Sequence, residues 1–214
     1  MTRRLTLALA VAAIAVGGAS CGIPPSPNAT VFNAQADGGA CNGPKSINIY
    51  LVTQANGHER LQPVRRAHVA RDGDEAICAI NALNAGPTSD EVINGLSTAF
   101  VLPEGLTYLG ADNGVAMVQL DAAFLSIAQP TKIYEAYAQI VYTLTGLGVG
   151  ITKVQFIFDN GPYLGVLLPG GGVAKQGIVS RQSYCTFGPP GQGCSAASLG
   201  TKGAKGTNAT RTSA

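Results

Sequence analysis

Apolar and polar positions alternate over Ile47–Val52, and the alternation ends close to Asn56-Gly57, a dipeptide typical of tight hairpin turns. A second extended segment follows at Leu61–Val69. Pro63 lies within it and favours an edge strand or a bulge, because proline has no N–H to donate. The pattern therefore predicts an antiparallel hairpin at the start of the folded region.

The apolar spacing then becomes helical. Asp74–Asn84 has its apolar side chains on one stripe and is followed by Gly86-Pro87, which stops a helix. Thr88–Glu91 is a capping box that opens a short second helix. The longest predicted helix is Thr131–Leu147, with a buried stripe formed by Ile133, Tyr137, Ile140 and Leu144.

Further strands are predicted on both sides of that helix, at Leu106–Gly110, Val115–Leu120 and Thr152–Asp159, with Leu164–Leu168 and Gln176–Tyr184 extending the sheet. The predicted order is strand-strand-helix-strand-strand-helix-strand. Such an order predicts a single α+β domain, with helices packed on one face of a mixed, mainly antiparallel sheet.

The first 21 residues predict export. Arg3 and Arg4 are followed by the apolar run Leu5–Val16 and by small residues up to Cys21, the layout of a secretory signal. Cys21 resembles the lipobox cysteine of bacterial lipoproteins, although Gly18 replaces the usual leucine. The resemblance implies a lipid-modified Cys21, for example with palmitate, on the outer face of the cytoplasmic membrane. The alternative is ordinary signal cleavage and secretion.

Composition separates the rest of the chain into three parts. Residues 22–45 are rich in Pro, Asn, Gly and Ala and predict a flexible tether. Residues 46–187 contain the periodic segments and predict the domain. Residues 188–214 are rich in Gly, Ser, Thr and Lys and predict a disordered tail.

Charge argues against a nucleic-acid partner. The formal charge of the chain is +2, and it falls to zero once Arg3 and Arg4 leave with the signal. No basic cluster is interleaved with aromatic residues. His58 and His68 are the only histidines and no CxxC spacing exists, so the sequence predicts neither a metal site nor a cofactor.

Four cysteines remain after Cys21. An even number in an exported chain predicts two disulfides, for which three pairings exist. We favour Cys185–Cys194 as a short local loop and Cys41–Cys78 as a clamp on the N-terminal segment. Their expected role is stability.

Four sequence blocks occur in series at Ala85–Thr88, Gly95–Ala99, Gly114–Leu120 and Ala138–Thr145. Together they resemble the GerMN domain of sporulation and spore-germination proteins and of actinobacterial lipoproteins, over about Ile47–Gly161. Two departures are Phe100–Leu102, where the family usually has a single apolar residue, and Gln119 at a commonly acidic position. The resemblance implies a non-catalytic extracytoplasmic domain, tied to envelope assembly, peptidoglycan-related processes or signalling partners, and folded like ring-building motifs.

Catalytic patterns are incomplete. Ser97 stands in a stretch that lacks the second glycine of a nucleophile elbow, and Gly170–Gly172 before Lys175 lacks the ending of a phosphate loop. A glycan hydrolase acting on wall material is one alternative function, and its acids would come from Glu104, Asp112, Asp121 and Asp159. A carrier with an apolar cavity is a second alternative.

The candidate interaction surface consists of four side chains. Arg65 and Arg66 are adjacent on a strand and must point to opposite faces, so that one is solvated or pairs with an acid. Gln139 and Tyr142 are expected at the edge of the buried helix stripe. The predicted function is a lipid-anchored binding module that presents a sheet face or edge to an envelope protein or, as a second choice, to peptidoglycan.

Overall fold

The β-hairpin predicted from the alternating pattern opens the fold. In a computed structural model of the chain, β1 (Lys45–Ala55) pairs antiparallel with β2 (His58–Val69), and the turn lies between Ala55 and His58. The short strand β3 (Leu96–Ser97) pairs with the other side of β1, so the order of this sheet is β2-β1-β3. The structure describes residues 41, 43–55, 57–69, 71–100, 105–125, 130–158, 161–192 and 194.

Pro63 lies in the edge strand β2, as expected, opposite Tyr50 of β1. The main-chain N–H and C=O of Tyr50 point away from β2, toward a helix on the far side of β1. The nitrogen of Pro63 therefore faces the outer edge of the sheet, where the ring removes a hydrogen-bond donor.

The second sheet is mixed. β4 (Leu106–Asp112) pairs antiparallel with β5 (Val115–Leu120), and β5 pairs parallel with β6 (Lys153–Phe158). Two short strands, β7 (Gly161–Pro162) and β8 (Ile178–Val179), pair antiparallel with β6. The α+β class with mainly antiparallel pairing is confirmed, and the strands divide between two sheets.

The helices follow the predicted periodicity. They are α1 (Glu75–Asn84), α2 (Ser89–Ile93), α3 (Ala122–Leu125) and α4 (Pro130–Thr145). The predicted capping box is present at α2, where Thr88 Oγ1 accepts from Glu91 N and Glu91 Oε2 accepts from Thr88 N at 2.7 Å.

The region after β6 differs from the prediction. Of the two predicted strands only Ile178–Val179 joins the sheet, while Leu167 forms an isolated bridge with Val173. The rest contains two 3₁₀ segments, η1 (Lys175–Gly177) and η2 (Arg181–Phe187). Ser180 explains the second, because its side chain and that of Ser183 form a capping box that starts a helical turn.

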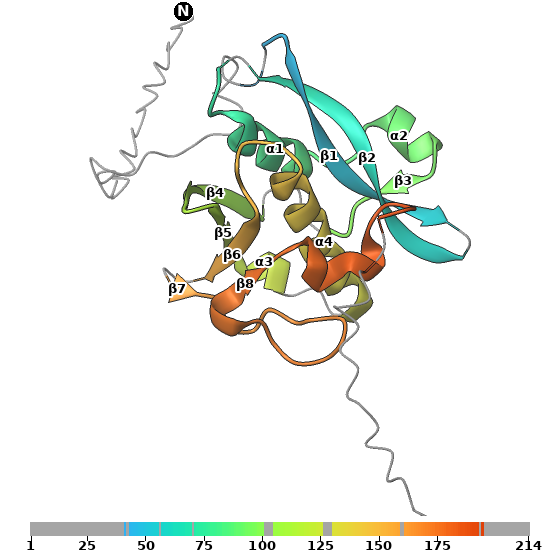
Figure 1. Cartoon of the computed structure of the whole chain (residues 1–214). Coiled ribbons are helices and arrows are strands. Elements are labelled where there is room, and N and C mark those ends of the chain that lie inside the picture. The colour runs from blue at the N-terminus through green and yellow to red at the C-terminus, as the bar shows by residue number, and fades with distance from the viewer. Residues whose placement is uncertain are drawn as a thin grey trace, which may run out of the picture. The chain divides into compact units, whose positions relative to one another are not determined.

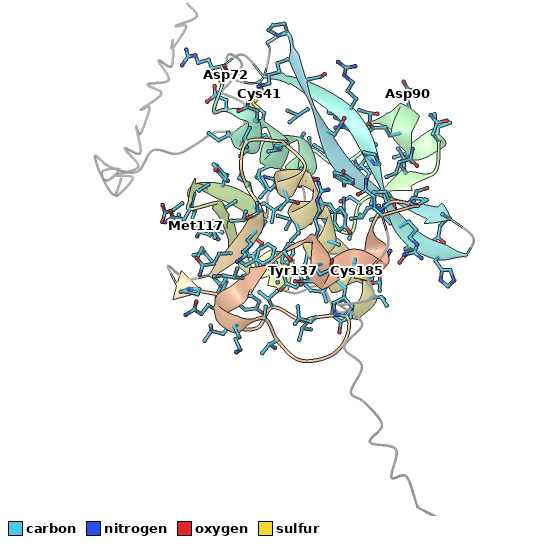
Figure 2. The ribbon with its side chains drawn as sticks, in the orientation of Figure 1. Cys41, Asp72, Asp90, Met117, Tyr137 and Cys185 are labelled. Atoms are coloured by element: carbon cyan, nitrogen blue, oxygen red, sulfur yellow. A yellow bond between two sulfur atoms is a disulfide. The ribbon has the colours of Figure 1, made fainter. Side chains whose placement is uncertain are left out.

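Helix α4 lies between the hairpin β1–β2 and the second sheet, with α1 beside it (Figure 1). The ring of Tyr137, on α4, lies in the interior (Figure 2), with its centroid 5.4 Å from that of Phe124 and 4.8 Å from that of Phe156. The ring centroid of Tyr184, in η2, lies 6.1 Å from that of Tyr137. Burial of these four rings joins α3, α4, β6 and η2 into one core.

Arg181 attaches η2 to the end of α4. Its Nε donates to Thr145 Oγ1 at 2.7 Å and its Nη2 donates to the carbonyl of Tyr142 at 3.0 Å, near the carbonyl end of the helix. A Cβ on Gly146 would lie 2.6 Å from that Nη2, so the approach requires glycine.

Both favoured disulfides are present. Cys41 is joined to Cys78 of α1, and Cys185 of η2 is joined to Cys194, with Cα atoms 5.5 Å and 4.9 Å apart. They attach residues of the predicted tether and tail to the domain. Apart from these residues, 43–45 and 188–192, the predicted signal, tether and tail lie outside the described residues, and their bounds stay predictions.

Gln139 of α4 continues the hydrogen bonding of β1 where β3 ends. Its Nε2 donates to the carbonyl of Tyr50 at 3.0 Å, and its Oε1 accepts from the N–H of Ala99 at 2.7 Å. One helical turn later, Thr143 Oγ1 accepts from the N–H of Tyr50 at 3.0 Å. Two side chains of a helix thus pair with the main chain of a buried strand edge.

Replacing Gln139 with Leu should destabilise the domain by about 2–4 kcal/mol, because a buried carbonyl and a buried N–H lose their partners. Urea unfolding at constant pH measures the change. The matched control is Gln62→Leu on the exposed surface of β2, which should change stability by less than about 0.5 kcal/mol. Equal losses in the two variants would contradict the role given to Gln139.

Candidate functional site

The two arginines of the predicted interaction surface have different surroundings. Arg65 is exposed, and its Nε donates to Ser46 Oγ at 2.5 Å. Arg66 forms a two-pronged ion pair with Glu91 of α2, through Nε to Oε1 at 3.1 Å and through Nη2 to Oε2. Arg66 is therefore the arginine that pairs with an acid, and Arg65 is the one available to a partner.

The ion pair of Arg66 has a structural role. Burial works against ionisation of Glu91, but the Arg66 guanidinium and the N–H of Thr88 outweigh it and hold the pKa of Glu91 below its usual range. The same carboxylate caps α2 and binds β2. It thereby fixes the short helix against the hairpin.

The predicted edge positions of Gln139 and Tyr142 are wrong. Gln139 is 0 % exposed and Tyr142 is 2 % exposed, so neither contributes to a surface for a partner. The reason is that α4 is covered by β1 and by η2 in addition to the second sheet, and Tyr142 packs against Tyr50 with ring centroids 5.5 Å apart. Both residues are part of the core.

The acids proposed for a glycan hydrolase have local roles where they are described. Asp112 is the last residue of β4, next to the turn that leads to β5, and accepts from Asn113 Nδ2 at 2.9 Å. Asp121 follows the far end of β5 and caps α3, with its Oδ1 accepting from the N–H of Phe124 at 2.7 Å. A six-residue strand separates the two, about 20 Å. Glu104 and Asp159 lie outside the described residues.

The histidines and Ser97 are not brought together. His58 begins β2 and His68 pairs with Ser46 near the opposite end of the same strand. Ser97 Oγ donates to the carbonyl of Val52. Within the described chain, no group of three or more His, Cys, Asp or Glu side chains is arranged to hold a metal ion.

An open groove lies beside the turn of the hairpin. Its volume is about 770 Å³, within the usual range for small-ligand sites. Side chains from β1, β2, the start of α4 and η2 line it, among them Gln54, His58, Glu59, Thr131, Glu135 and Phe187. The elements that line it are far apart in the sequence, which is why no local motif indicates the groove.

Two of the residues that line this groove, Glu59 and Glu135, have carboxyl groups that are bridged by the amine of Lys132. Lys132 Nζ lies 2.5 Å from Glu59 Oε1 and 2.8 Å from Glu135 Oε2, and so bridges β2 and α4. The Glu135 side chain is 1 % exposed, and no N–H or hydroxyl group donates to its Oε1. The sequence contains only a weak signal for this cluster, the i, i+3 spacing of Lys132 and Glu135.

The cluster separates the pKa values of its two acids. Burial, together with the neighbouring Glu59 carboxyl, raises the pKa of Glu135 to about 7, against the opposing effect of Lys132. The hydrogen bond with Glu135 lowers the pKa of Glu59, and Lys132 lowers it further against the effect of burial. Glu135 thus exchanges its proton near neutral pH while Glu59 is ionised.

The described helices include none that is both long and apolar enough to cross a lipid bilayer.

Comparison with known proteins gives similar solved structures. The first GerMN domain of the Bacillus subtilis sporulation protein GerM is 19% identical, with 64% of this chain and 98% of that chain covered and a TM-score of 0.49. The tandem GerMN domains of the same protein give 20% identity and a TM-score of 0.48. That match covers 64% of this chain, which spans 45% of the tandem structure. A Clostridium perfringens protein described as a putative lipoprotein gives 20% identity and a TM-score of 0.34. That match covers 55% of this chain and 76% of that chain.

No curated protein matches this chain. The family model described as Germane, sporulation and spore germination, matches residues 48–164, more than half of the chain. The matched residues include most of the hairpin, the four α-helices of the described residues and β4 to β7. The chain therefore belongs to the Germane (GerMN) family of sporulation and spore-germination domains.

Proposed function

We propose that this protein is a non-catalytic binding module of the bacterial envelope, anchored by a lipid on Cys21 to the outer face of the cytoplasmic membrane. The observation that carries the proposal is the open groove beside the hairpin turn, whose lining includes the buried carboxyl group of Glu135. Outside it, Ser97 contacts a strand, Asp112 contacts a turn residue and Asp121 caps a helix.

The disulfides support an extracytoplasmic location. Two bonds join cysteines at both ends of the domain, and such bonds persist in oxidising compartments. Cys21 and the secretory layout before it lie outside the described residues and support the same location from the sequence alone.

The geometry favours binding by a groove or a face over strand addition at β2. Pro63 removes a donor from the centre of the outer edge of β2, so an incoming strand would lose a main-chain hydrogen bond there. At the edge of the other sheet, β4 carries a bulge between Tyr108 and Gly110 that interrupts its register.

The carrier alternative requires an apolar cavity between helices and sheet. Where α4 faces β6, the space is filled by the rings of Tyr137 and Phe156, and the groove beside the hairpin is open and has the ionisable side chains of Glu59, Arg60 and Glu135 in its lining. We therefore prefer a polar ligand or a protein partner.

Replacing Cys21 with Ala should release the protein from membranes into the medium, because the thiol that would carry the lipid is lost. Fractionation of cells that express the wild-type and variant chains, with detection by immunoblot, measures this release. Cys185→Ser is the control, because it removes a cysteine of the domain and leaves the anchor. Unchanged membrane retention of Cys21→Ala would refute lipid anchoring.

Incubation of the purified domain with peptidoglycan should release no soluble saccharide, because Asp112 and Asp121 lie a strand length apart. Chromatography of the supernatant measures the release, and lysozyme serves as the positive control. Turnover that is lost in Asp121→Asn or Glu104→Gln would establish the hydrolase instead.

A crosslinking pull-down from intact cells tests the binding function. Specific recovery of an envelope protein or of wall material supports it. Recovery no greater than that obtained with an unrelated lipoprotein would contradict it.

A further inference from the structure

More acidic than basic groups are present in the cluster formed by Glu59, Lys132 and Glu135. Two carboxylates face a single ammonium when both acids are ionised. Burial, together with the neighbouring Glu59 carboxyl, raises the pKa of Glu135 to about 7, so this group takes up a proton near neutral pH. The free protein thus uses a proton to complete a site that has room for a second cation.

Nitrogen donors reach one oxygen of each carboxyl group. Gln54 Nε2 and Lys132 Nζ both donate to Glu59 Oε1, at 3.3 Å and 2.5 Å, and Lys132 also donates to Glu135 Oε2. Oε1 of Glu135 is left without a donor. The remaining oxygens are Glu59 Oε2, on a side chain 27 % exposed, and the buried Glu135 Oε1, and the two acids share a hydrogen bond through the proton of Glu135.

The other groups around the groove do not supply the missing charge. Arg60 also lines the groove, but its guanidinium donates to the carbonyl of Thr186 and forms no ion pair with Glu59 or Glu135. His58 is exposed at the rim. The groove is also lined by Thr186 and Phe187 of η2, by the Cys185–Cys194 disulfide and by Gln54 of β1. None of these groups is charged.

We propose that this groove binds an extended peptide through a side-chain ammonium group, which Glu59 contacts directly and Glu135 stabilises as the carboxylate behind it. The ammonium takes the place of the proton held by the two acids, so that binding releases one proton and completes a cluster of two negative and two positive charges. This inference deepens the proposed binding function and rests on it.

The width and character of the groove fit such a ligand. Its volume of about 770 Å³ is several times that of one ammonium-bearing side chain, which leaves room for the flanking peptide. Phe187 is half-buried and offers an apolar surface to the methylene groups of that side chain, while Gln54 and Thr131 offer polar groups to its backbone.

The same charge balance predicts pH-dependent stability in the ligand-free protein. The pKa of Glu135 is raised in the folded state, so its contribution to stability is present below pH 4.5 and is lost as pH rises through about 7. The lowered pKa of Glu59 acts in the acidic range instead and does not oppose this loss. The melting temperature should fall between pH 5 and pH 8, and Glu135→Gln should abolish most of that fall.

The direct test of the ligand uses two matched probes. Nα-acetyl-lysine methylamide carries the ammonium, and its Nε-acetylated form has the same chain without the charge. We expect chemical-shift changes of groove amides with the first probe alone, and binding that strengthens from pH 6 to pH 8. Equal binding of the two probes would overturn the proposal without any variant being made.

Variants then distinguish the role of Glu59 from that of Glu135. Glu59→Gln should weaken binding of the lysine probe by about tenfold. Glu135→Gln should remove the proton release that calorimetry in buffers of different ionisation enthalpy detects. Asp90→Asn, at an exposed acid of α2, is the matched control and should change neither quantity. Equal weakening in Asp90→Asn, or full proton release in Glu135→Gln, would refute the roles given to Glu59 and Glu135.

The source of the peptide is identified by measuring retention of the domain on purified peptidoglycan, before and after chemical acetylation of the amines of that peptidoglycan. Retention of the domain that acetylation abolishes assigns the ammonium to wall stem peptides. Binding of the lysine probe without retention on either material assigns it to a protein segment. If the probe fails to bind while the crosslinking pull-down still recovers a specific partner, the ammonium inference fails and the proposed binding function stands.

Discussion

The fold depends on the amide side chain of Gln139, which connects a helix to the main chain of a sheet inside the core. Its two ends reach Tyr50 of β1 and Ala99 after β3, and it is fully buried. A buried amide is tolerated only when it is paired, so these contacts determine how α4 lies against β1. Thr143 adds a second such contact one turn further on. The orientation of α4 in turn positions its two ends.

The two ends of α4 contact different parts of the structure. At the carbonyl end, Arg181 binds the last turn of the helix and lies 5.0 Å from the ring centroid of Tyr142, which attaches η2. At the amino end, Lys132 and Glu135 meet Glu59 of the hairpin. Because η2 forms one wall of the groove and the hairpin forms another, the walls are all attached to the same helix. Sites on such rigid elements hold their geometry better than sites on loops.

The contacts also give physical reasons for the four sequence blocks. Thr98 Oγ1 and the N–H of Ala99, from the second block, both meet Gln139 from the fourth. Gly86, from the first, has a positive φ and lies where its Cβ would contact Thr98. In the third, the carbonyl of Gly114 accepts from the N–H groups of Thr152 and Lys153, which starts β6 beside β5. The blocks record how distant segments pack together.

The sequence alone determined the hairpin, the two main helices, the capping box at Thr88 and the second strand pair, because each depends on neighbouring residues and on a period that can be read along the chain. Tertiary structure decided what depends on which segments meet. It divided the strands between two sheets, buried Gln139 and Tyr142, and turned most of Gln176–Tyr184 into 3₁₀ structure. It also placed Glu59 beside Glu135, 76 positions later in the chain, where burial raises the pKa of Glu135. Periodicity reports which face of an element is apolar, whereas the desolvation of a carboxyl group depends on every segment that covers it.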